Sequence, residues 1–208
     1  MHDGTVSDHD VPLFERFEHA DVRALVDAYP LAWVCPPSGS LLDAALLPLV
    51  GVYAPDDSLV ELIGHIPRSS PLFAALHRER RVFFLFRGPD SYISPANAGR
   101  RDWAPSWNFA QLRIEAEVFF DDALTEPALE MLIEKMEREQ SDPWKIAELG
   151  ARYPGMLEQI IGFRATGLTI CGRYKLGQDE RIETLEHIIS SLPDGAMAEW
   201  MRGFAARR

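Results

Sequence analysis

The sequence has no long apolar run, few cysteines and little basic charge. A helix that spans a bilayer needs about 20 consecutive apolar residues, and no stretch of this 208-residue chain approaches that length. Residues 1–10 are polar or acidic and lack the basic start and apolar centre of a signal peptide. We therefore expect no membrane insertion, a frayed tail over residues 1–12 and a cytoplasmic protein.

The two cysteines, Cys35 and Cys171, belong to no metal-binding or redox pattern. Both stand in apolar, strand-like sequence far apart in the chain, without a C-x-x-C pair and without a histidine at ligand spacing. This usage predicts reduced thiols in the core and no metal site.

Basic residues are too few for a surface that binds nucleic acid unaided. The chain has 21 Lys and Arg against 32 Asp and Glu, a formal net charge of −11. Affinity for nucleic acid comes mainly from cations that neutralise phosphates, and the paired arginines at 80–81, 100–101 and 207–208 form no recognition helix. Direct nucleic-acid binding is expected to be absent or weak.

Several well-known catalytic motifs are also missing. The chain contains no G-x-S-x-G, no phosphate-binding P-loop, no H-E-x-x-H and no G-x-G-x-x-G. Hydrolase, nucleoside-triphosphatase, zinc-protease and dinucleotide-binding functions therefore lack support. No pair of carboxylates stands out by spacing, and the catalytic residues remain unassigned.

The most informative stretch present is residues 81–120, which contains two kinds of strand. The unbroken apolar run 82–86 predicts a strand buried on both faces, whereas apolar and charged residues alternate over 112–118, which predicts one buried face. We expect a loop over 88–95 between them. Aromatic, hydroxyl and amide side chains follow at 103–109, and such a set suits either core packing or a flat ligand with a polar rim.

The flanking sequence predicts short strands enclosed by helices. We expect helices over 20–28, 71–77, 124–138 and 182–192, short helices opening near 142 and 153, and strands over 31–35, 41–53, 59–66 and 160–170. Ser69 or Ser70 is expected to cap the helix at Pro71, and Asp179 or Asp194 one of the last helices. The pattern predicts one α+β domain over residues 13–208 with an antiparallel barrel core.

Motifs along nearly the whole chain resemble one known family. Residues 87–95 (RGPDSYISP) and 105–109 (PSWNF) resemble the central motif of the PaiB-like FMN-binding negative transcriptional regulators, which belong to the split-barrel flavin-binding class. Further matching motifs occur in the family's order at 29–32 (YPLA), 64–71 (GHIPRSSP), 161–163 (IGF) and 175–178 (KLGQ). The resemblance implies an antiparallel split β-barrel with flanking helices and a helical C-terminal part.

Some positions depart from the family pattern. Ser70, Gly177 and Asp179 stand where the family usually has Asn, Ser and Asn, and Leu46 where it often has His. Residues 96–98 replace its usual Trp-Tyr pair. These departures concern cofactor binding more than the fold.

A flavin site needs cations and N–H donors for the phosphate, polar groups for the ring edge and apolar cover for the ring faces. Guided by the resemblance, we select nine candidates, namely His65, Arg68, Ser69, Ser70, Tyr92, Trp107, Asn108, Lys175 and Gln178. Arg68 and the two serines at the predicted helix start suit the phosphate, because a helix N-terminus favours an anion.

Each of these roles has a structural alternative. A serine could only cap the helix while Arg68 pairs with a surface carboxylate. His65 could bond to backbone, and Lys175 could be a solvated strand end.

Two functions remain open at this stage. One is an FMN-binding protein, either a simple flavin binder or a flavin-dependent oxidoreductase. The other is a regulatory or interaction protein that retains the barrel without flavin. The resemblance and the density of aromatic residues near the central stretch also imply a homodimer.

Overall fold

The computed structural model describes residues 11–38, 40–193 and 195–207. The chain forms two compact units, each described by itself. The barrel unit consists of His19–Phe86 and Arg113–Ile170, and the terminal unit of Met1–Glu18, Arg87–Leu112 and Cys171–Arg208. The prediction of one domain over 13–208 concerns both units together and stays a prediction, and most of the expected tail over 1–12 lies outside the described residues.

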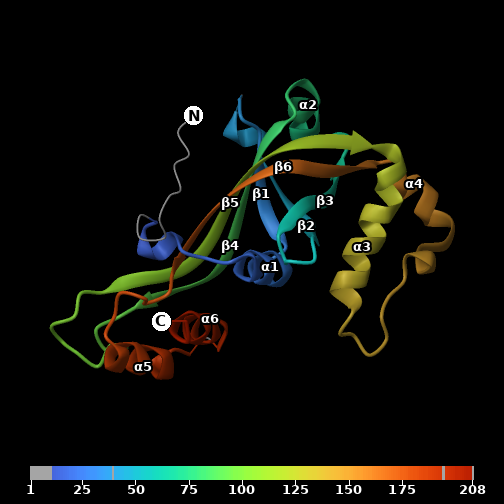
Figure 1. The fold of residues 1–208 in the computed structure, drawn as a ribbon. Helices are drawn as coiled ribbons and strands as arrows, with labels where there is room; N and C mark the ends of the chain where they lie inside the picture. Colours follow the sequence, from blue (N-terminus) through green and yellow to red (C-terminus); the bar gives the residue numbers. More distant parts are fainter. Residues whose placement is uncertain (1–10, 39, 194, 208) are drawn as a thin grey trace. The chain divides into compact units, whose positions relative to one another are not determined.

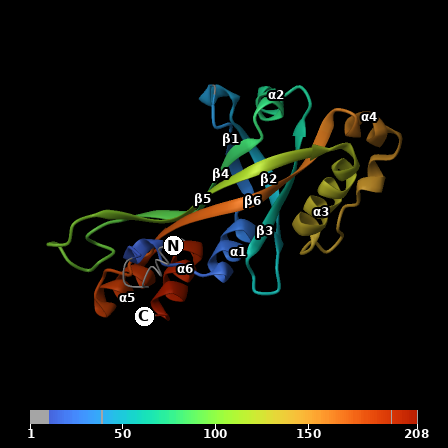
Figure 2. The same ribbon diagram turned by 45° about the horizontal axis from the view of Figure 1, so that its top comes forward.

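Six strands form a closed barrel in the spatial order β1-β2-β3-β6-β5-β4 (Figures 1 and 2). Their bounds are Leu31–Cys35 for β1, Ala45–Tyr53 for β2, Leu59–Pro67 for β3, Arg81–Ile93 for β4, Ser106–Asp121 for β5 and Ile160–Lys175 for β6. β1 pairs antiparallel with β2 and β4, and β3 with β2 and β6. The predicted α+β fold with an antiparallel barrel is confirmed.

Alternation along each strand fills the inside of the barrel. Ala32 lies opposite both Leu47 and Phe86, and Gly64 lies opposite Leu49 and Phe163, so these residues share one face. The inward face is apolar and buried, with Val34, Leu49, Leu62, Ile66, Phe84, Phe86, Phe163 and Ala165 each at most 2% exposed. Burial of these side chains stabilises the fold through the hydrophobic effect.

Burial of residues 82–86 on both faces was a wrong expectation. Val82, Phe84 and Phe86 are buried, but Leu85 is 39% exposed. The strand lies in an antiparallel barrel, where only the inward side chains reach the core.

The helices of the barrel unit follow the sequence patterns closely. They are α1 His19–Ala28, α2 Pro71–Arg78, α3 Thr125–Glu137 and α4 Tyr153–Leu157, with 3₁₀ turns Leu41–Asp43, Asp122–Leu124 and Ile146–Arg152. Ser70 Oγ accepts a hydrogen bond from Leu72 N at 3.2 Å, which confirms the predicted cap of α2. The strand expected from residue 41 begins only at Ala45, because Ser40 caps a 3₁₀ turn first.

α3 covers the outer face of β2 and β3. Val50 and Ile63 on the strands and Ala128 on the helix form the buried centre of this contact. The start of α3 lies directly on Gly162, where an added Cβ would stand 2.6 Å from the carbonyl carbon of Leu124. Gly162 N also donates to Thr125 Oγ1 at 3.0 Å, so backbone as well as side chains fix this helix.

A polar cluster joins the other end of α3 to α1. Lys135 Nζ and the Tyr53 hydroxyl both donate to Asp27 Oδ1, at 2.6 and 3.0 Å. Arg23 Nε lies 3.6 Å from Asp27 Oδ2. Burial and the neighbouring Asp27 carboxylate raise the pKa of Tyr53 above its ordinary value, so its hydroxyl stays protonated and keeps donating.

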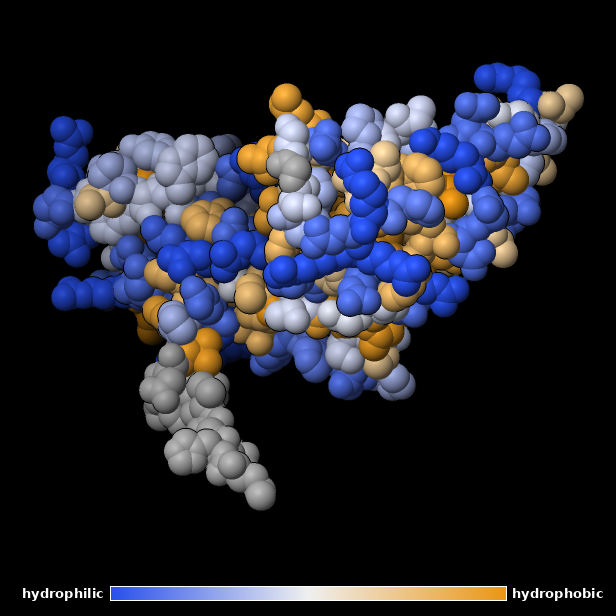
Figure 3. Space-filling view, turned by 90° about the horizontal axis from the view of Figure 1, so that it is seen from above, coloured by the Kyte–Doolittle hydropathy of each residue, from blue (hydrophilic) through white to orange (hydrophobic). Residues whose placement is uncertain are grey.

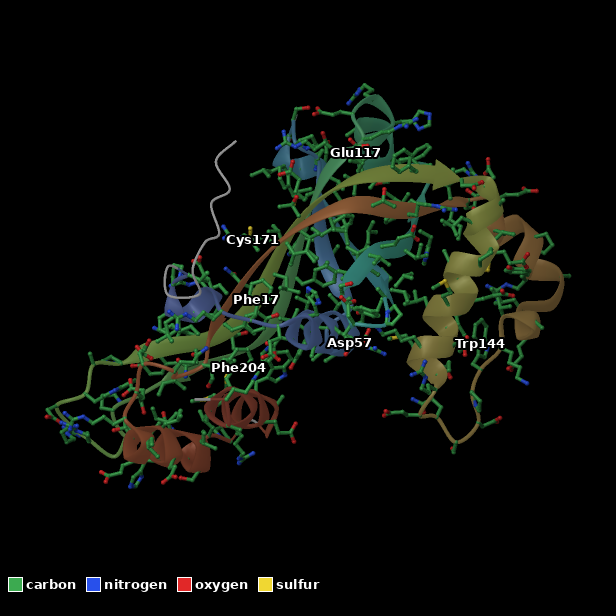
Figure 4. The ribbon with its side chains drawn as sticks, in the orientation of Figure 1. Phe17, Asp57, Glu117, Trp144, Cys171 and Phe204 are labelled. Carbon is green, nitrogen blue, oxygen red and sulfur yellow. The ribbon has the colours of Figure 1, made fainter. Side chains whose placement is uncertain are left out.

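The terminal unit contains η1 Leu13–Glu15, α5 Ile182–Ser191, α6 Gly195–Ala205 and the adjoining ends of β4, β5 and β6. Its centre is the buried ring of Tyr174, with centroids 5.6 Å from Phe17, 5.1 Å from Phe204 and 6.1 Å from Trp200. Figure 4 labels Phe17, which follows η1, and Phe204 on α6. Aromatic packing therefore joins the N-terminal segment, β6 and α6.

Three sequence expectations are corrected in the terminal unit. β4 continues to Ile93 through the predicted loop over 88–95. Its pairing with β1 ends at Phe86, and the strand beyond can contain Pro89 because a proline without an N–H is tolerated where one edge is unpaired. Cys171 is exposed rather than in the core, and α5 begins after Arg181 with no side-chain cap, so Asp179 does not cap it.

Asp194, the other cap candidate, lies outside the described residues. No helix in the described ranges has both the length and the apolar character needed to cross a bilayer.

Removal of the Asp27 carboxylate should loosen α3. Asp27→Ala leaves the Lys135 ammonium, whose side chain is 15% exposed, and the Tyr53 hydroxyl without their shared acceptor. We expect the free energy of unfolding to fall by about 2 kcal/mol in urea denaturation. Glu134→Ala removes an exposed charge from the same helix and should change it by less than about 0.5 kcal/mol. Equal losses in the two variants would contradict the role of the cluster.

Candidate functional site

The nine candidate residues fall into two groups, one in each unit. His65, Arg68, Ser69 and Ser70 belong to the barrel unit, at the end of β3 and the start of α2. The other five, Tyr92, Trp107, Asn108, Lys175 and Gln178, belong to the terminal unit. The geometry of each group is described within its own unit.

Arg68 lies where β3 ends and is held by several contacts. Its backbone N–H donates to Gln159 O at 2.9 Å and its Nε to Glu158 O at 3.2 Å. Its Nη2 forms an ion pair with Asp122 Oδ1. The cap by Ser70 and the ion pair of Arg68 are the two contacts expected if these residues have only a structural role, a helix cap and a surface ion pair. The Arg68 and Asp122 side chains are 38% and 79% exposed, and such an exposed pair is weak enough for a stronger anion to replace the carboxylate.

A groove of about 410 Å³ opens beside this ion pair. It is lined by Arg68, Asp122, Ala123, Thr125, Glu126, Pro154, Leu157 and Glu158. Arg68 is the cation of this lining, which also includes the acidic residues Asp122, Glu126 and Glu158. The groove thus combines one anion-binding group with an acidic rim.

His65 points away from the barrel interior, opposite Gly162 of β6. Its Nδ1 is buried and has no hydrogen-bond partner among the described residues. Burial lowers the pKa of His65 below its ordinary value, which favours the neutral imidazole. A buried nitrogen without a partner is costly, so this atom is a candidate for a bond to a bound ligand.

Tyr92 and Trp107 come together on one face of the terminal unit. Their ring centroids are 5.9 Å apart, and the side chains are 49% and 54% exposed. A groove of about 370 Å³ beside Trp107 is lined by Arg87, Asp90, Trp107, Phe109, Ala110 and Gln111. This aromatic face could cover the flat face of a ring system.

Asn108 does not share that face. It is 4% exposed, and its Nδ2 donates to Met201 Sδ at 3.6 Å. Successive residues of a strand point to opposite sides, so Trp107 and Asn108 on β5 cannot face one ligand surface together.

Lys175 and Gln178 are engaged within the terminal unit. Lys175 Nζ donates to Ser106 Oγ and lies 6.0 Å from the ring centre of Phe14. Gln178 Oε1 accepts from Leu176 N at 2.7 Å, while its Nε2 donates to Tyr174 O at 2.6 Å. These two bonds stabilise the turn that contains Gly177, whose φ is 86°. Gln178 therefore has a structural role here.

Sequence reasoning missed the partners of Arg68. Asp122 and Glu158 lie 54 and 90 residues away in the chain, and no local pattern signals them. Phe109, in contrast, could have been found, because it follows Trp107 by two residues on the same strand and so points to the same side.

Each unit offers chemistry that suits part of a flavin. In the barrel unit, Arg68 and the hydroxyls of Ser69 and Ser70 suit a phosphate, and His65 Nδ1 is a polar atom without a partner among the described residues. In the terminal unit, the exposed rings of Tyr92 and Trp107 suit a flat face. Within the described ranges no group of three or more His, Cys, Asp or Glu could hold a metal ion.

Comparison with known structures supports the same fold. The flavocytochrome Anf3 from Azotobacter vinelandii superposes with a TM-score of 0.57 at 16% identity, over 76% of this chain and 68% of that one. An FAD- and haem-binding protein from Mycobacterium smegmatis gives 0.56 at 18% identity, over 83% and 78%. A conserved hypothetical protein from Mycobacterium tuberculosis gives 0.53 at 13%, over 79% and 89%.

At these identities the three structures establish the likeness of fold alone. None of the curated proteins compared matches this sequence significantly. A family model described as "Putative FMN-binding domain" matches residues 11–166, which is more than half of the chain. The protein therefore belongs to this FMN-binding domain family.

Proposed function

We propose that this protein binds FMN and serves as a flavin-dependent oxidoreductase. The observation that carries the proposal is that Arg68, Ser69 and Ser70 stand consecutively before the start of α2 and that Arg68 is the cation of a surface groove, in a chain whose family supports FMN as its cofactor. Bound FMN supplies the redox chemistry, because the flavin rather than the protein carries hydride or electrons. The chain's own residues bind and orient it.

The phosphate end is assigned to the barrel unit. Arg68 would provide a charge-assisted hydrogen bond, and the serine hydroxyls would donate further ones. The first N–H groups of α2 and its dipole favour the negative charge. His65 Nδ1, which lacks a partner among the residues that the structure describes, would gain one from the ligand.

The ring end is left unassigned. Tyr92 and Trp107, whose rings are neighbours and half exposed in the terminal unit, stay candidates from the sequence for apolar cover. Lys175, in the same unit, stays a candidate cation. Asn108 and Gln178 stay candidates from the sequence, although each already has partners in the terminal unit.

Two of the similar structures are described as a flavocytochrome and as an FAD- and haem-binding protein. These descriptions support a redox role here over a purely structural one. The alternative is a cytoplasmic transcriptional regulatory or interaction protein that retains the barrel without flavin. The net charge of −11 disfavours direct DNA binding in that role, and tight retention of duplex at physiological salt would contradict this expectation.

The phosphate assignment is tested by Arg68→Ala. Purified wild-type protein should absorb near ~450 nm through bound flavin, or should gain this band on addition of FMN. Arg68→Ala should lower FMN affinity about ten- to a hundredfold in a fluorescence titration, from the loss of roughly 1.5–3 kcal/mol for a charged hydrogen bond.

Arg78→Ala is the matched control. It removes the same charge from the last turn of α2, away from the helix start, and should leave FMN affinity within about twofold. Unchanged affinity in folded Arg68→Ala protein would remove Arg68 from the site. A wild-type protein that never binds FMN would favour the flavin-free alternative.

We also propose that the protein is a homodimer that associates through the outer face of β1. Trp33 lies opposite Leu46 on β2 and Leu85 on β4, and Leu31 lies two residues before it on the same side. All four are large apolar side chains between 39% and 51% exposed. Figure 3 shows that apolar residues reach the surface among charged ones on the face it draws, and this group of four spans three adjacent strands. Such a contiguous apolar surface is typical of an interface.

A charge at the centre of this surface should prevent association. Trp33→Glu is expected to convert a dimer into a monomer at micromolar concentration in sedimentation equilibrium, because it places a carboxylate in an apolar contact. Val60→Glu alters another exposed apolar strand residue, 44% exposed, and should leave the dimer intact. A monomeric wild-type protein that still binds flavin would rule out the proposed dimer.

A further inference from the structure

We infer that Asp122 competes with the FMN phosphate for Arg68 and so limits the affinity of this protein for phosphorylated flavin. The inference rests on the proposed flavin site, but it concerns a residue that the family motifs do not include. It begins from the ion pair between Arg68 Nη2 and Asp122 Oδ1. The guanidinium proposed to bind the phosphate already binds an anion of this chain.

The guanidinium is held in place independently of Asp122. Arg68 Nε donates to Glu158 O at 3.2 Å, and its backbone N–H donates to Gln159 O at 2.9 Å. Loss of the carboxylate would therefore leave the cation in position at the edge of the groove. Its remaining N–H groups would be available to another acceptor.

The Asp122 carboxylate is not needed for the local fold. The 3₁₀ turn Asp122–Leu124 is capped by the preceding residue, since Asp121 Oδ1 accepts from Ala123 N at 2.9 Å. The Asp122 side chain is 79% exposed. Its contact with Arg68 is thus a surface ion pair that a ligand can displace at small cost.

Carboxylate and phosphate compete for the same donor geometry. A guanidinium binds either group through parallel charged hydrogen bonds. A phosphate monoester has a second pKa near ~6 and is largely a dianion at neutral pH, so it can displace Asp122 but then lies near a displaced carboxylate. Asp122 acts on the phosphate in two ways, by occupying Arg68 and by repelling the dianion.

The test compares FMN with riboflavin, which has the same ring system without the phosphate. Asp122→Asn keeps the size of the side chain and removes its charge. We expect FMN to bind this variant about five- to twentyfold more tightly in a fluorescence titration. Riboflavin binding, whether strong or weak, should change by less than about twofold, because the carboxylate acts on the phosphate alone.

Two controls separate this pairing from a general effect of charge. Glu158→Gln removes a carboxylate from the same groove and keeps the backbone carbonyl that accepts from Arg68, so FMN affinity should change by less than about twofold. In an Arg68→Ala background, Asp122→Asn should raise FMN affinity by at most about threefold, since the competition for the guanidinium no longer exists.

Several results would overturn the inference. It fails if Asp122→Asn leaves FMN affinity unchanged or lowers it, if Glu158→Gln gives an equal gain, or if riboflavin gains as much as FMN. In each case wild-type FMN binding and its loss in Arg68→Ala would still support the proposed function. If the wild-type protein does not bind FMN, the proposed function fails and this inference fails with it.

Discussion

The closed barrel is the constraint on which the rest of the structure depends. Each strand must present alternate side chains to a filled interior, which fixes the opposite set on the outside. Ala32, Leu49, Gly64 and Phe163 belong to the inner set. The candidate functional residues of the barrel unit therefore lie among the outward-facing side chains or at the strand ends, because the inward-facing positions are needed to fill the core.

The outer surface of the barrel is covered by a helix over some strands and exposed over others. α3 covers β2 and β3 through an apolar contact and the Asp27 cluster, whereas the outer side of β1 keeps Trp33 half exposed. The end of β3 leads directly into α2, which places Arg68 next to a helix start. One strand thus contributes to the core, to the α3 contact and to the proposed phosphate site.

Much of this fold could be predicted from the sequence, because its signals are local. The alternation over 112–118, the cap at Ser70 and the helical period of α3 each depend on a few neighbouring residues. The extension of β4 past Gly88 could not, since a proline reads as a breaker unless the end of the neighbouring strand is known. An ion pair of Arg68 with a carboxylate was one of the sequence expectations, but the identity of Asp122 as its partner could not be predicted, because only the folded barrel brings the two residues together. The candidate residues were chosen from the family resemblance and by chemical type, which gave suitable groups but not their partners or the directions of their side chains.

The close contact at Gly162 has a consequence for the interpretation of motifs. The Ile161–Phe163 motif contributes to the resemblance to flavin-binding split barrels. Its glycine, however, is in close contact with the start of α3, which packs directly against the Gly162 backbone. A larger residue would push that helix from the barrel whether or not flavin is ever bound. A shared motif of this kind reflects a packing requirement that is common to the folds of the two proteins. It would persist in a relative that had lost its cofactor. The glycine of this motif is therefore evidence for the fold, whereas evidence for flavin binding has to come from residues proposed to contact the ligand, such as Arg68.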